Sequence, residues 1–168
     1  MPKTRYSFYP WPSPVGLLIL ISSPLGLKRI IFASAMPDWY SQISLYADED
    51  QRPLNSTIRS LRSYFFDKND KGLRKLKLDI SGTPFQMSVW KKLIEIPYGS
   101  IRTYAAIAKN IGHPDSARAV GNAIGRNPVP IIIPCHRVIK SDGSLGGFIC
   151  DVKMKRILLE KEGILIRK

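Results

Sequence analysis

The amino-terminal half of the chain carries short apolar runs rich in β-branched residues, which are typical of β-strands. Two of these runs, Val15–Ser22 and Leu27–Ala33, are separated by a Ser-Pro-Leu-Gly stretch with turn-forming residues. They predict a β-hairpin. Apolar and polar residues alternate over residues 76–80, and this alternation predicts one more short strand.

A helical pattern lies between these predicted strands. Asn55 is placed to cap a helix that carries Ile58, Leu61 and Phe65 on one stripe. The polar segment Lys68–Lys75 predicts an exposed loop with solvated charges. We therefore expect an α/β amino-terminal domain over residues 1–81, with antiparallel strands and a helix, and a boundary near Ser81-Gly82.

The second half, residues 82–168, predicts a mostly α-helical domain. Thr83 and Gln86 have the spacing of a capping box, and Pro84 suits the first helical turn. The apolar positions that follow, Phe85, Val89, Trp90 and Leu93, indicate a largely buried helix. Pro97-Tyr98-Gly99 is expected to end this segment.

Two short helices are predicted next, at residues 103–110 and 117–126, with Asp115 or Ser116 as the cap of the second. Helix, turn and helix in this order give the outline of a helix-turn-helix. The second helix has small residues at Ala117, Ala119 and Gly121, beside one long cation, Arg118. Such a helix can lie in a narrow DNA groove, or it can pack closely on another helix; the spacing alone leaves both open.

Composition favours a soluble protein with a polyanionic partner. The 168 residues are 44% hydrophobic and 23% charged, and 26 Lys and Arg residues against 13 acids give a net charge of +13. Nucleic acid is the first candidate partner, an anionic membrane surface the second, and a charge-rich surface without a partner the third. The longest apolar run, Val15–Ile21, is too short to span a bilayer, and we expect a cytoplasmic protein with no membrane partner.

The chemical centre predicted from the sequence is Cys135. It follows a short apolar segment, residues 131–133, which predicts a buried strand. Prolines on both sides of this segment restrict the backbone. A thiol attacks as its thiolate, so a base such as His136 must take the proton, directly or through a water. Two cysteines do not make a disulfide framework, and Cys135 beside His136 lacks zinc-ligand spacing, so no metal site is expected.

A third group should orient the histidine, and the predicted carboxy-terminal helix supplies Glu162. On a helical wheel Glu162 falls inside the apolar arc, where a carboxylate needs a partner. The residues expected to face the interior of this helix are Met154, Ile157, Leu158 and Leu159. A lone buried cysteine and a solvated late-helix glutamate are the alternative interpretation.

At this point the chain resembles the O6-alkylguanine-DNA alkyltransferases. The active-site signature of that family is similar to Ile133-Pro134-Cys135-His136-Arg137-Val138. The other matching segments, in order and spacing, are Gly82-Thr83-Pro84-Phe85-Gln86, Val89-Trp90, Ile96-Pro97-Tyr98-Gly99, Thr103-Tyr104, Ala117-Arg118-Ala119-Val120-Gly121, Asn127-Pro128, Leu158-Leu159 and Glu162-Gly163. The resemblance is strong over residues 82–163. Over residues 1–81 it is weaker and implies a small ribonuclease-H-like α/β domain.

The resemblance implies a role for each catalytic candidate. Cys135 would accept the alkyl group from O6 of guanine, and also from O4 of thymine. His136 would take the thiol proton through a water, and Glu162 would orient His136. Asn127 would hold the supporting turn, and Tyr104 would hydrogen-bond guanine N3 and supply a proton to the leaving base. Each molecule would act once, without a cofactor, because the thioether product has no easy leaving group.

The family also implies a minor-groove contact with double-stranded DNA by a monomer. Arg118 would fill the gap left by the flipped nucleotide. The surface expected to contact DNA comprises Thr103, Ser116, Ala117, Arg118, Ala119, Gly121 and Asn122. The pocket is expected to use Val138, Phe148 and Ile149; the backbone of Cys135 and Val138 would read the exocyclic amine, and the N–H of Ile149 would reach O6.

One stretch departs from the family pattern. Gly147-Phe148-Ile149-Cys150-Asp151 stands where the family has a Tyr-Ser-Gly-Gly-like sequence, so the range of bulky adducts is left open. Cys150 is expected to be a bystander, with a redox role as the alternative. The rival functions are a non-catalytic reader of alkylated DNA, a DNA-binding regulator and a cysteine hydrolase with multiple turnover.

Overall fold

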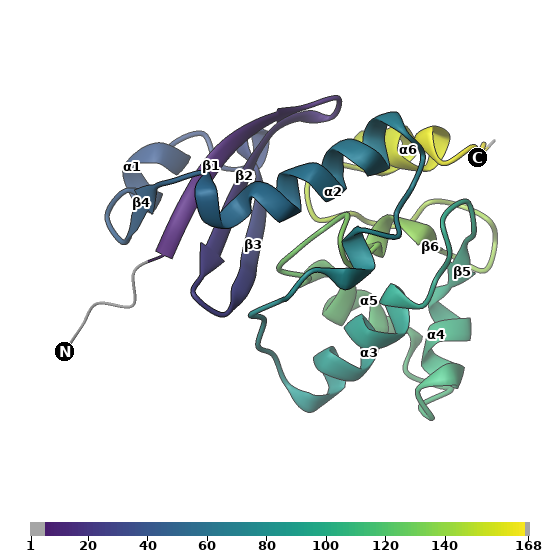
Figure 1. Ribbon diagram of the computed structural model, residues 1–168. Helices are drawn as coiled ribbons and strands as arrows, with labels where there is room; N and C mark the ends of the chain where they lie inside the picture. The colour runs from purple at the N-terminus through teal and green to yellow at the C-terminus, as the bar shows by residue number, and fades with distance from the viewer. Residues whose placement is uncertain (1–5, 167–168) are drawn as a thin grey trace. The chain divides into compact units, whose positions relative to one another are not determined.

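The computed structural model describes residues 6–166 and shows two compact units that divide after Ile80 (Figure 1). The first is an α/β unit and the second is largely helical. Each unit buries its own set of apolar side chains.

A four-stranded mixed sheet forms the centre of the first unit. Its strands are β1 (Tyr6–Ser13), β2 (Gly16–Ser23), β3 (Gly26–Phe32) and β4 (Ala47–Glu49), in the spatial order β3-β2-β1-β4. β1, β2 and β3 are antiparallel neighbours, and β4 runs parallel to β1. The predicted hairpin is therefore confirmed as β2 and β3, whereas β1, which contains two prolines, carried no strand prediction.

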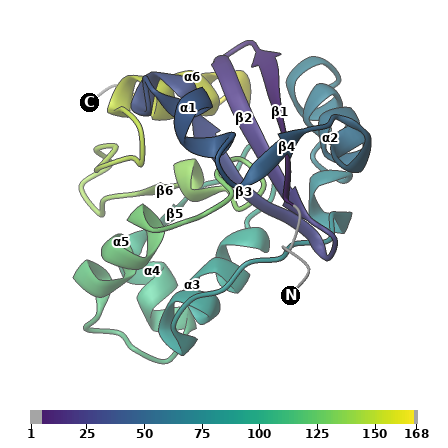
Figure 2. The same ribbon diagram turned by 90° about the vertical axis from the view of Figure 1, so that its left-hand side faces the viewer.

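The sheet is covered on both faces, which explains the unbroken apolar run of β2. Residues of odd and even position on a strand point to opposite sides. Phe8 of β1 contacts Trp39 of the short helix α1 (Trp39–Ile43), with ring centroids 6.2 Å apart. Trp11 of β1 contacts Phe65 of α2 (Asn55–Phe66) at 6.0 Å. Figure 2 shows α1 and α2 on opposite sides of the strands.

Three local predictions for this unit need correction. Asn55 begins α2 but does not cap it, because the cap position belongs to Leu54 and the Asn55 side chain accepts from Gln51. Residues 76–80 form only an isolated bridge, Leu27 with Leu78, and no strand. The segment after α2 is not wholly solvated, since a 3-10 turn (Leu73–Lys75) buries Leu73.

The second unit contains four helices and a minimal two-stranded sheet among its described residues. The helices are α3 (Pro84–Ile94), α4 (Tyr104–Asn110), α5 (Ala117–Gly125) and α6 (Val152–Lys161). The strands β5 (Arg102–Thr103) and β6 (Val138–Ile139) pair in parallel. The predicted capping box at Thr83 and Gln86 is confirmed, with hydrogen bonds of 3.3 and 2.9 Å.

The helices α3, α4 and α5 pack against one another, and a buried tryptophan fixes α5. The indole N–H of Trp90 donates to the carbonyl of Ala123 at 2.9 Å. Gly82 permits this arrangement, because a Cβ there would come within 2.8 Å of the Trp90 ring. Ser116 occupies the cap position of α5, yet its side chain makes no capping hydrogen bond, so that part of the prediction is wrong.

Two further predictions fail, one for residues 131–133 and one for the buried face of α6. Residues 131–133 are buried but form a turn rather than a strand, with Ile131 in the left-handed region at φ 76°. On α6 the buried stripe runs through Lys155, Leu158, Leu159 and Glu162, at the i, i+3, i+4, i+7 spacing of a helix face. Ile157 lies off this stripe and is 41% exposed.

Candidate active site

The reactive cysteine stands at the end of a rigid connector built on Asn127. The side-chain amide of Asn127 donates to the carbonyl of Ile133 at 2.8 Å, and its oxygen accepts from the N–H of Val129 at 3.0 Å. Both bonds are buried, so Asn127 satisfies backbone groups that the turn would otherwise leave without partners. This arrangement supports the unusual φ of Ile131 and fixes the backbone that enters Cys135.

Cys135 begins a 3-10 turn (Cys135–Arg137) instead of ending a strand. Its residue is only 1% exposed, yet its side chain borders a cleft. Burial raises the pKa of the Cys135 thiol to about 11, and an Asn127 hydrogen bond and the Lys155 charge offset only part of this rise. The resting site therefore holds a protonated thiol, so a base has to take its proton before the sulfur can attack.

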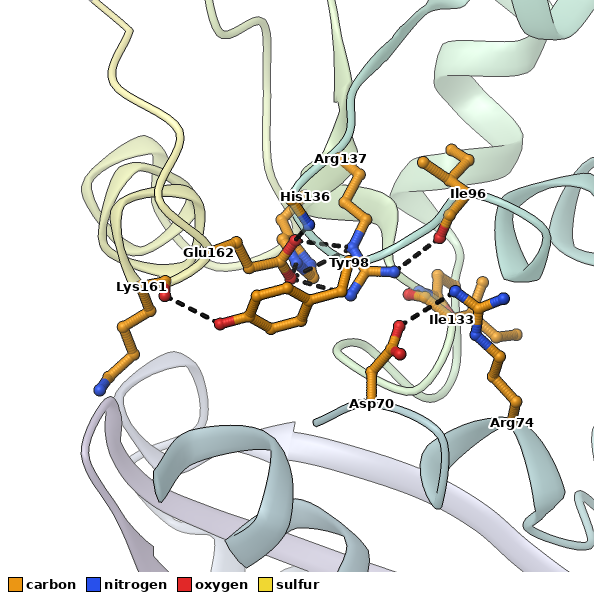
Figure 3. A network of polar contacts seen from close by, with 11 residues as sticks. Asp70, Arg74, Ile96, Tyr98, Ile133, His136, Arg137, Lys161 and Glu162 are labelled. Atoms are coloured by element: carbon orange, nitrogen blue, oxygen red, sulfur yellow. Dashed lines mark hydrogen bonds and ion pairs between the residues drawn. The ribbon is translucent and has the colours of Figure 1, made fainter. Parts of the chain in front are cut away.

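The next residue in the turn, His136, is held by the carboxylate of Glu162. Nε2 of His136 lies 2.7 Å from Oε1 of Glu162, and both side chains are fully shielded from solvent. Glu162 is the carboxy-terminal cap residue of α6, so the turn and the helix end meet here. Figure 3 shows the carboxylate between the imidazole of His136 and the guanidinium of Arg137.

Arg137 is a central partner that the sequence analysis did not single out. Its Nε donates to both oxygens of Glu162 at 3.1 and 2.9 Å, and its Nη2 donates to Oε1 at 2.9 Å. Its Nη1 donates to the carbonyl of Ile96 at 2.7 Å. The side chain is 2% exposed, so this is a buried ion pair with several charge-assisted hydrogen bonds.

The loop after α3 completes this network. The N–H of Gly99 donates to Oε2 of Glu162 at 3.1 Å. The hydroxyl of Tyr98 donates to the carbonyl of Lys161 at 2.9 Å (Figure 3). Gly99 has φ 72°, a conformation that glycine adopts without strain. The family-like Pro97-Tyr98-Gly99 stretch therefore anchors the end of α6 rather than ending α3, which stops at Ile94.

These contacts set the charge states of the pair. Burial raises the pKa of Glu162, but the hydrogen bonds and charges of His136 and Arg137 outweigh it and lower that pKa to about 2. Burial lowers the pKa of His136 below its ordinary value of 6.5, and Glu162 opposes this shift without reversing it. At neutral pH the site thus holds an ionised glutamate and a neutral histidine that is able to accept a proton.

Lys155 is a second site residue that the sequence analysis missed. Its Nζ donates to the carbonyls of Val138, Leu145 and Gly147 at 2.6, 2.5 and 3.3 Å. Burial lowers its pKa to about 8, and the charge of Cys135 opposes that shift. A sequence signal existed: position 155 lies on the same helical stripe as the buried leucines and Glu162, where a lysine is unusual.

The cleft beside Cys135 has a volume of about 570 Å³ and lies wholly within the second unit. Of the residues predicted for catalysis, DNA contact or the pocket, eight line it: Tyr104, Ala117, Arg118, Gly121, Asn122, Cys135, Phe148 and Ile149. The structure thus brings together side chains from α4, α5, the cysteine turn and the loop before α6.

Of the residues predicted for DNA contact or the pocket, four do not line the cleft. Thr103 caps α4 by accepting from the N–H of Ala106 at 3.1 Å, and Ser116 stands at the start of α5. Ala119 is exposed on α5, outside the cleft. Val138 is fully buried, and its carbonyl accepts from Lys155. The role expected for Val138 is that of its backbone, and it stays a prediction.

Tyr104 forms part of the cleft wall and depends on a glycine opposite it. Gly146 has φ 68°, and a Cβ at this position would come within 2.8 Å of the Tyr104 hydroxyl. Burial and then the charge of Cys135 raise the pKa of Tyr104, so its hydroxyl stays protonated and able to donate. The ammonium of Lys155 lies 5.7 Å from the centre of the Tyr104 ring.

Residues 6–166 lack the features of two other kinds of site. Within this part of the chain, His, Cys, Asp and Glu side chains do not gather in threes that could hold a metal ion. No helix in the same range has the length and apolarity needed to cross a membrane.

Comparison with known proteins decides the family. Residues 84–164 match the model of the 6-O-methylguanine DNA methyltransferase DNA-binding domain. A methylated-DNA–protein-cysteine methyltransferase of Methanosarcina barkeri is 45% identical over 152 residues, covering 89% of this chain and 92% of the relative. The chain belongs to this family. A methylated-DNA–protein-cysteine methyltransferase of Haemophilus influenzae is 36% identical over 168 residues, covering 98% of this chain and 89% of the relative.

Solved structures agree with the family assignment. The crystal structure of Mycobacterium tuberculosis OGT in complex with DNA superimposes with a TM-score of 0.82 at 37% identity, over 94% of this chain and 92% of that one. The O6-methylguanine-DNA methyltransferase of Pyrococcus kodakaraensis has a TM-score of 0.66 at 24% identity, over 95% and 99% of the two chains, and shows the shared fold. The alkyltransferase resemblance found in the sequence is thereby confirmed.

Proposed function

We propose that this protein repairs alkylated DNA by transferring an alkyl group from O6 of guanine, and from O4 of thymine, to Cys135. The observation that carries the proposal is the position of Cys135, which borders a cleft of about 570 Å³ and is the chain neighbour of His136 in the buried His136–Glu162 pair. A thiol fixed inside the protein cannot reach O6 of a stacked base, so the damaged nucleotide has to leave the duplex.

Arg118 is proposed to fill the space left by that nucleotide. It is exposed on α5 and also lines the cleft, so one side chain connects the helix surface to the pocket. Ala117, Ala119 and Gly121 beside it are small and allow α5 to approach the minor groove closely. Unstacking a base costs a few kcal/mol, and insertion of the guanidinium offsets part of this cost.

The transfer begins when Cys135 loses its proton. With a thiol pKa of about 11, the sulfur needs a base, and neutral His136 accepts the proton through a water. Nε2 of His136 is engaged by Glu162, so the proton goes to Nδ1, and the ionised carboxylate stabilises the imidazolium that forms. Sulfur then attacks the alkyl carbon; the S–C bond forms as the C–O6 bond breaks.

Guanine leaves with its electron pair and is neutralised by a proton at N3 from Tyr104. The charge of the thiolate is one cause of the raised Tyr104 pKa, and this charge disappears when the sulfur becomes a thioether. The hydroxyl therefore becomes a better acid during the step that requires its proton.

Backbone groups are proposed to recognise the base. The carbonyls of Cys135 and Val138 would accept from the exocyclic amine, and the N–H of Ile149 would donate to O6. The Val138 carbonyl already accepts from Lys155, and a carbonyl oxygen has a second lone pair for the amine. Lys155 thus positions both the cysteine turn and the 145–147 loop around the guanine.

The reaction ends with a thioether, which no group in the site can cleave, so each molecule acts once and requires no cofactor.

We further propose that residues 1–81 form a ribonuclease-H-like domain and residues 82–168 the DNA-binding alkyltransferase domain, with α4 and α5 as a helix-turn-helix. The protein is proposed to act as a cytoplasmic monomer. Analytical ultracentrifugation with and without DNA tests the oligomeric state.

Intact mass measurement tests the central proposal. The protein is incubated with an excess of duplex DNA carrying O6-methylguanine. The expected product is protein carrying one added methyl group, and peptide mapping should place that group on Cys135. Cys135→Ala should abolish the change, whereas Cys150→Ala, the matched control, should keep it.

Other outcomes correspond to the rival functions. Binding without any mass change would indicate a non-catalytic reader or a DNA-binding regulator. Release of product in excess over protein would indicate a cysteine hydrolase. Either outcome overturns the proposed single transfer.

A further inference from the structure

We propose that Lys140 is a specificity-determining residue that favours O6-alkyl groups ending in a carboxylate over neutral groups of the same size. The inference rests on the proposed alkyl transfer and concerns the adducts that the same cleft accepts. The inference is drawn from the positive charges that line the cleft, because the alkyl transfer itself does not require them.

The lining of the cleft is electrostatically one-sided. Arg118 and Lys140 both line it, and none of the described lining residues is acidic. Apolar side chains supply much of the rest of the wall, namely Ala105, Ala117, Ile124, Phe148 and Ile149. Charges act more strongly across apolar walls than across water, so an anionic group that enters is attracted.

The two cations, Arg118 and Lys140, lie on different elements and have different proposed roles. Arg118 belongs to α5 and is committed to the duplex in the proposed mechanism. Lys140 follows β6 directly, on the loop that also contributes Ser141, Gly146 and Gly147 to the cleft. Lys140 is therefore the cation that remains to act on the adduct when DNA is bound.

The backbone of Lys140 is anchored, which fixes the point beside the cleft from which its side chain extends. Its N–H donates to the carbonyl of Ser144 at 2.9 Å, and its carbonyl accepts from the N–H of Gly143 at 3.1 Å. The nearest acid in sequence, Asp142, accepts from the N–H and hydroxyl of Ser144 at 2.9 and 2.7 Å and stabilises this turn. Asp142 does not line the cleft.

The test compares two nearly isosteric adducts, O6-carboxymethylguanine and O6-carbamoylmethylguanine, in otherwise identical duplexes. Single-turnover rate constants at limiting DNA are measured for both, and their ratio is the readout. Contacts with phosphate are the same in the two duplexes and cancel in the ratio. The intrinsic reactivities differ, so the change of this ratio on mutation, rather than its absolute value, carries the information.

Lys140→Met should lower the carboxymethyl-to-carbamoylmethyl ratio by about threefold, the size expected for one partly exposed charge. Lys140→Glu should lower it further, and added salt should reduce the ratio of the wild-type protein but not that of Lys140→Met. The matched control is Lys109→Met, which removes an exposed charge on α4 outside the cleft and should leave the ratio unchanged.

An unchanged ratio in Lys140→Met would overturn the inference. If both rates then fell equally, Lys140 would be a phosphate contact instead. The failure of the inference differs from failure of the proposed function, because O6-methylguanine is included as a third substrate. Methyl transfer with an unresponsive ratio refutes only the role of Lys140, whereas no transfer from any duplex refutes the proposed function.

Discussion

Nε of Arg137 donates hydrogen bonds to both carboxylate oxygens of Glu162, at 3.1 and 2.9 Å, in a region shielded from solvent. The same carboxylate holds His136. The glutamate therefore serves two functions: it neutralises a buried guanidinium and it orients the proton acceptor of the cysteine.

Glu162→Gln should strongly destabilise the protein, because it leaves the Arg137 charge buried without a counter-charge. We expect a loss of about 3–5 kcal/mol in the free energy of unfolding, the usual cost of breaking a buried pair. Urea denaturation at pH 7 measures it. Glu160→Gln, on the exposed side of α6, is the matched control and should change stability by less than about 0.5 kcal/mol.

The double variant Arg137→Met/Glu162→Gln distinguishes the loss of the ion pair from the cost of leaving one charge buried without a partner. Removing both charges should recover part of the stability lost in the single variant, since no uncompensated ion remains. A double variant less stable than Glu162→Gln alone would contradict this account.

Acid should remove the contribution of Glu162. Its pKa is about 2 in the folded protein against an ordinary value of 4.5, so its stabilisation is fully present above about pH 5 and is lost as the pH falls towards 2. His136 also makes the fold less stable as the pH falls below its ordinary pKa of 6.5. Burial lowers its pKa in the folded protein, so the unfolded chain binds a proton that the folded protein does not.

The stability difference between the wild-type protein and Glu162→Gln is the measurable quantity. It should shrink by about 2 kcal/mol between pH 7 and pH 3, since each pKa unit corresponds to about 1.4 kcal/mol. Denaturation curves at both pH values test this, and a constant difference would show that the ionisation of Glu162 does not stabilise the fold.

Lys155→Met should slow alkyl transfer. The ammonium of Lys155 lowers the pKa of Cys135 and holds the carbonyls of Val138, Leu145 and Gly147. Losing this favourable charge disfavours the thiolate, and we expect the transfer rate constant to fall about tenfold. Lys153→Met, at an exposed position of the same helix, should keep the wild-type rate.

A pH profile distinguishes the charge of Lys155 from its structural role. The pKa of Lys155 is about 8, so the wild-type protein has the ammonium below this pH and loses it above. The ratio of wild-type to Lys155→Met rate constants should therefore be largest below pH 7 and fall as the pH rises through 8. A flat ratio would mean that the lysine only supports the loop.

Arg118→Ala should impair repair of duplex DNA more than repair of single strands. In a duplex the side chain fills the gap left by the flipped nucleotide, and a single strand has no such gap. Single-turnover rates on both substrates give the comparison. Arg126→Ala, at the exposed end of α5, is the matched control and should affect the two substrates alike; equal losses in Arg118→Ala would refute the proposed insertion.

Local signals explain which parts of the fold were predictable. The hairpin of β2 and β3, the capping box of α3 and the helix pair α4 and α5 follow from turn residues, caps and periodicity close together in the chain. The strand at residues 131–133 was wrongly predicted, because an apolar run does not reveal that Asn127 bonds to the backbone of Val129 and Ile133 and bends the chain.

The sequence by itself determined the chemistry: a cysteine beside a histidine, a glutamate on an apolar helical arc, and the ordered motifs of an alkyltransferase. Only the tertiary structure decided the charge states of the site residues. Arg137 and Lys155 lie 25 and 7 residues from Glu162 in the chain, yet both side chains are buried at the site. Burial, rather than residue type, is also the largest cause of the pKa shifts of Cys135 and His136. Desolvation depends on everything packed around a group, and that environment exists only once distant segments have come together.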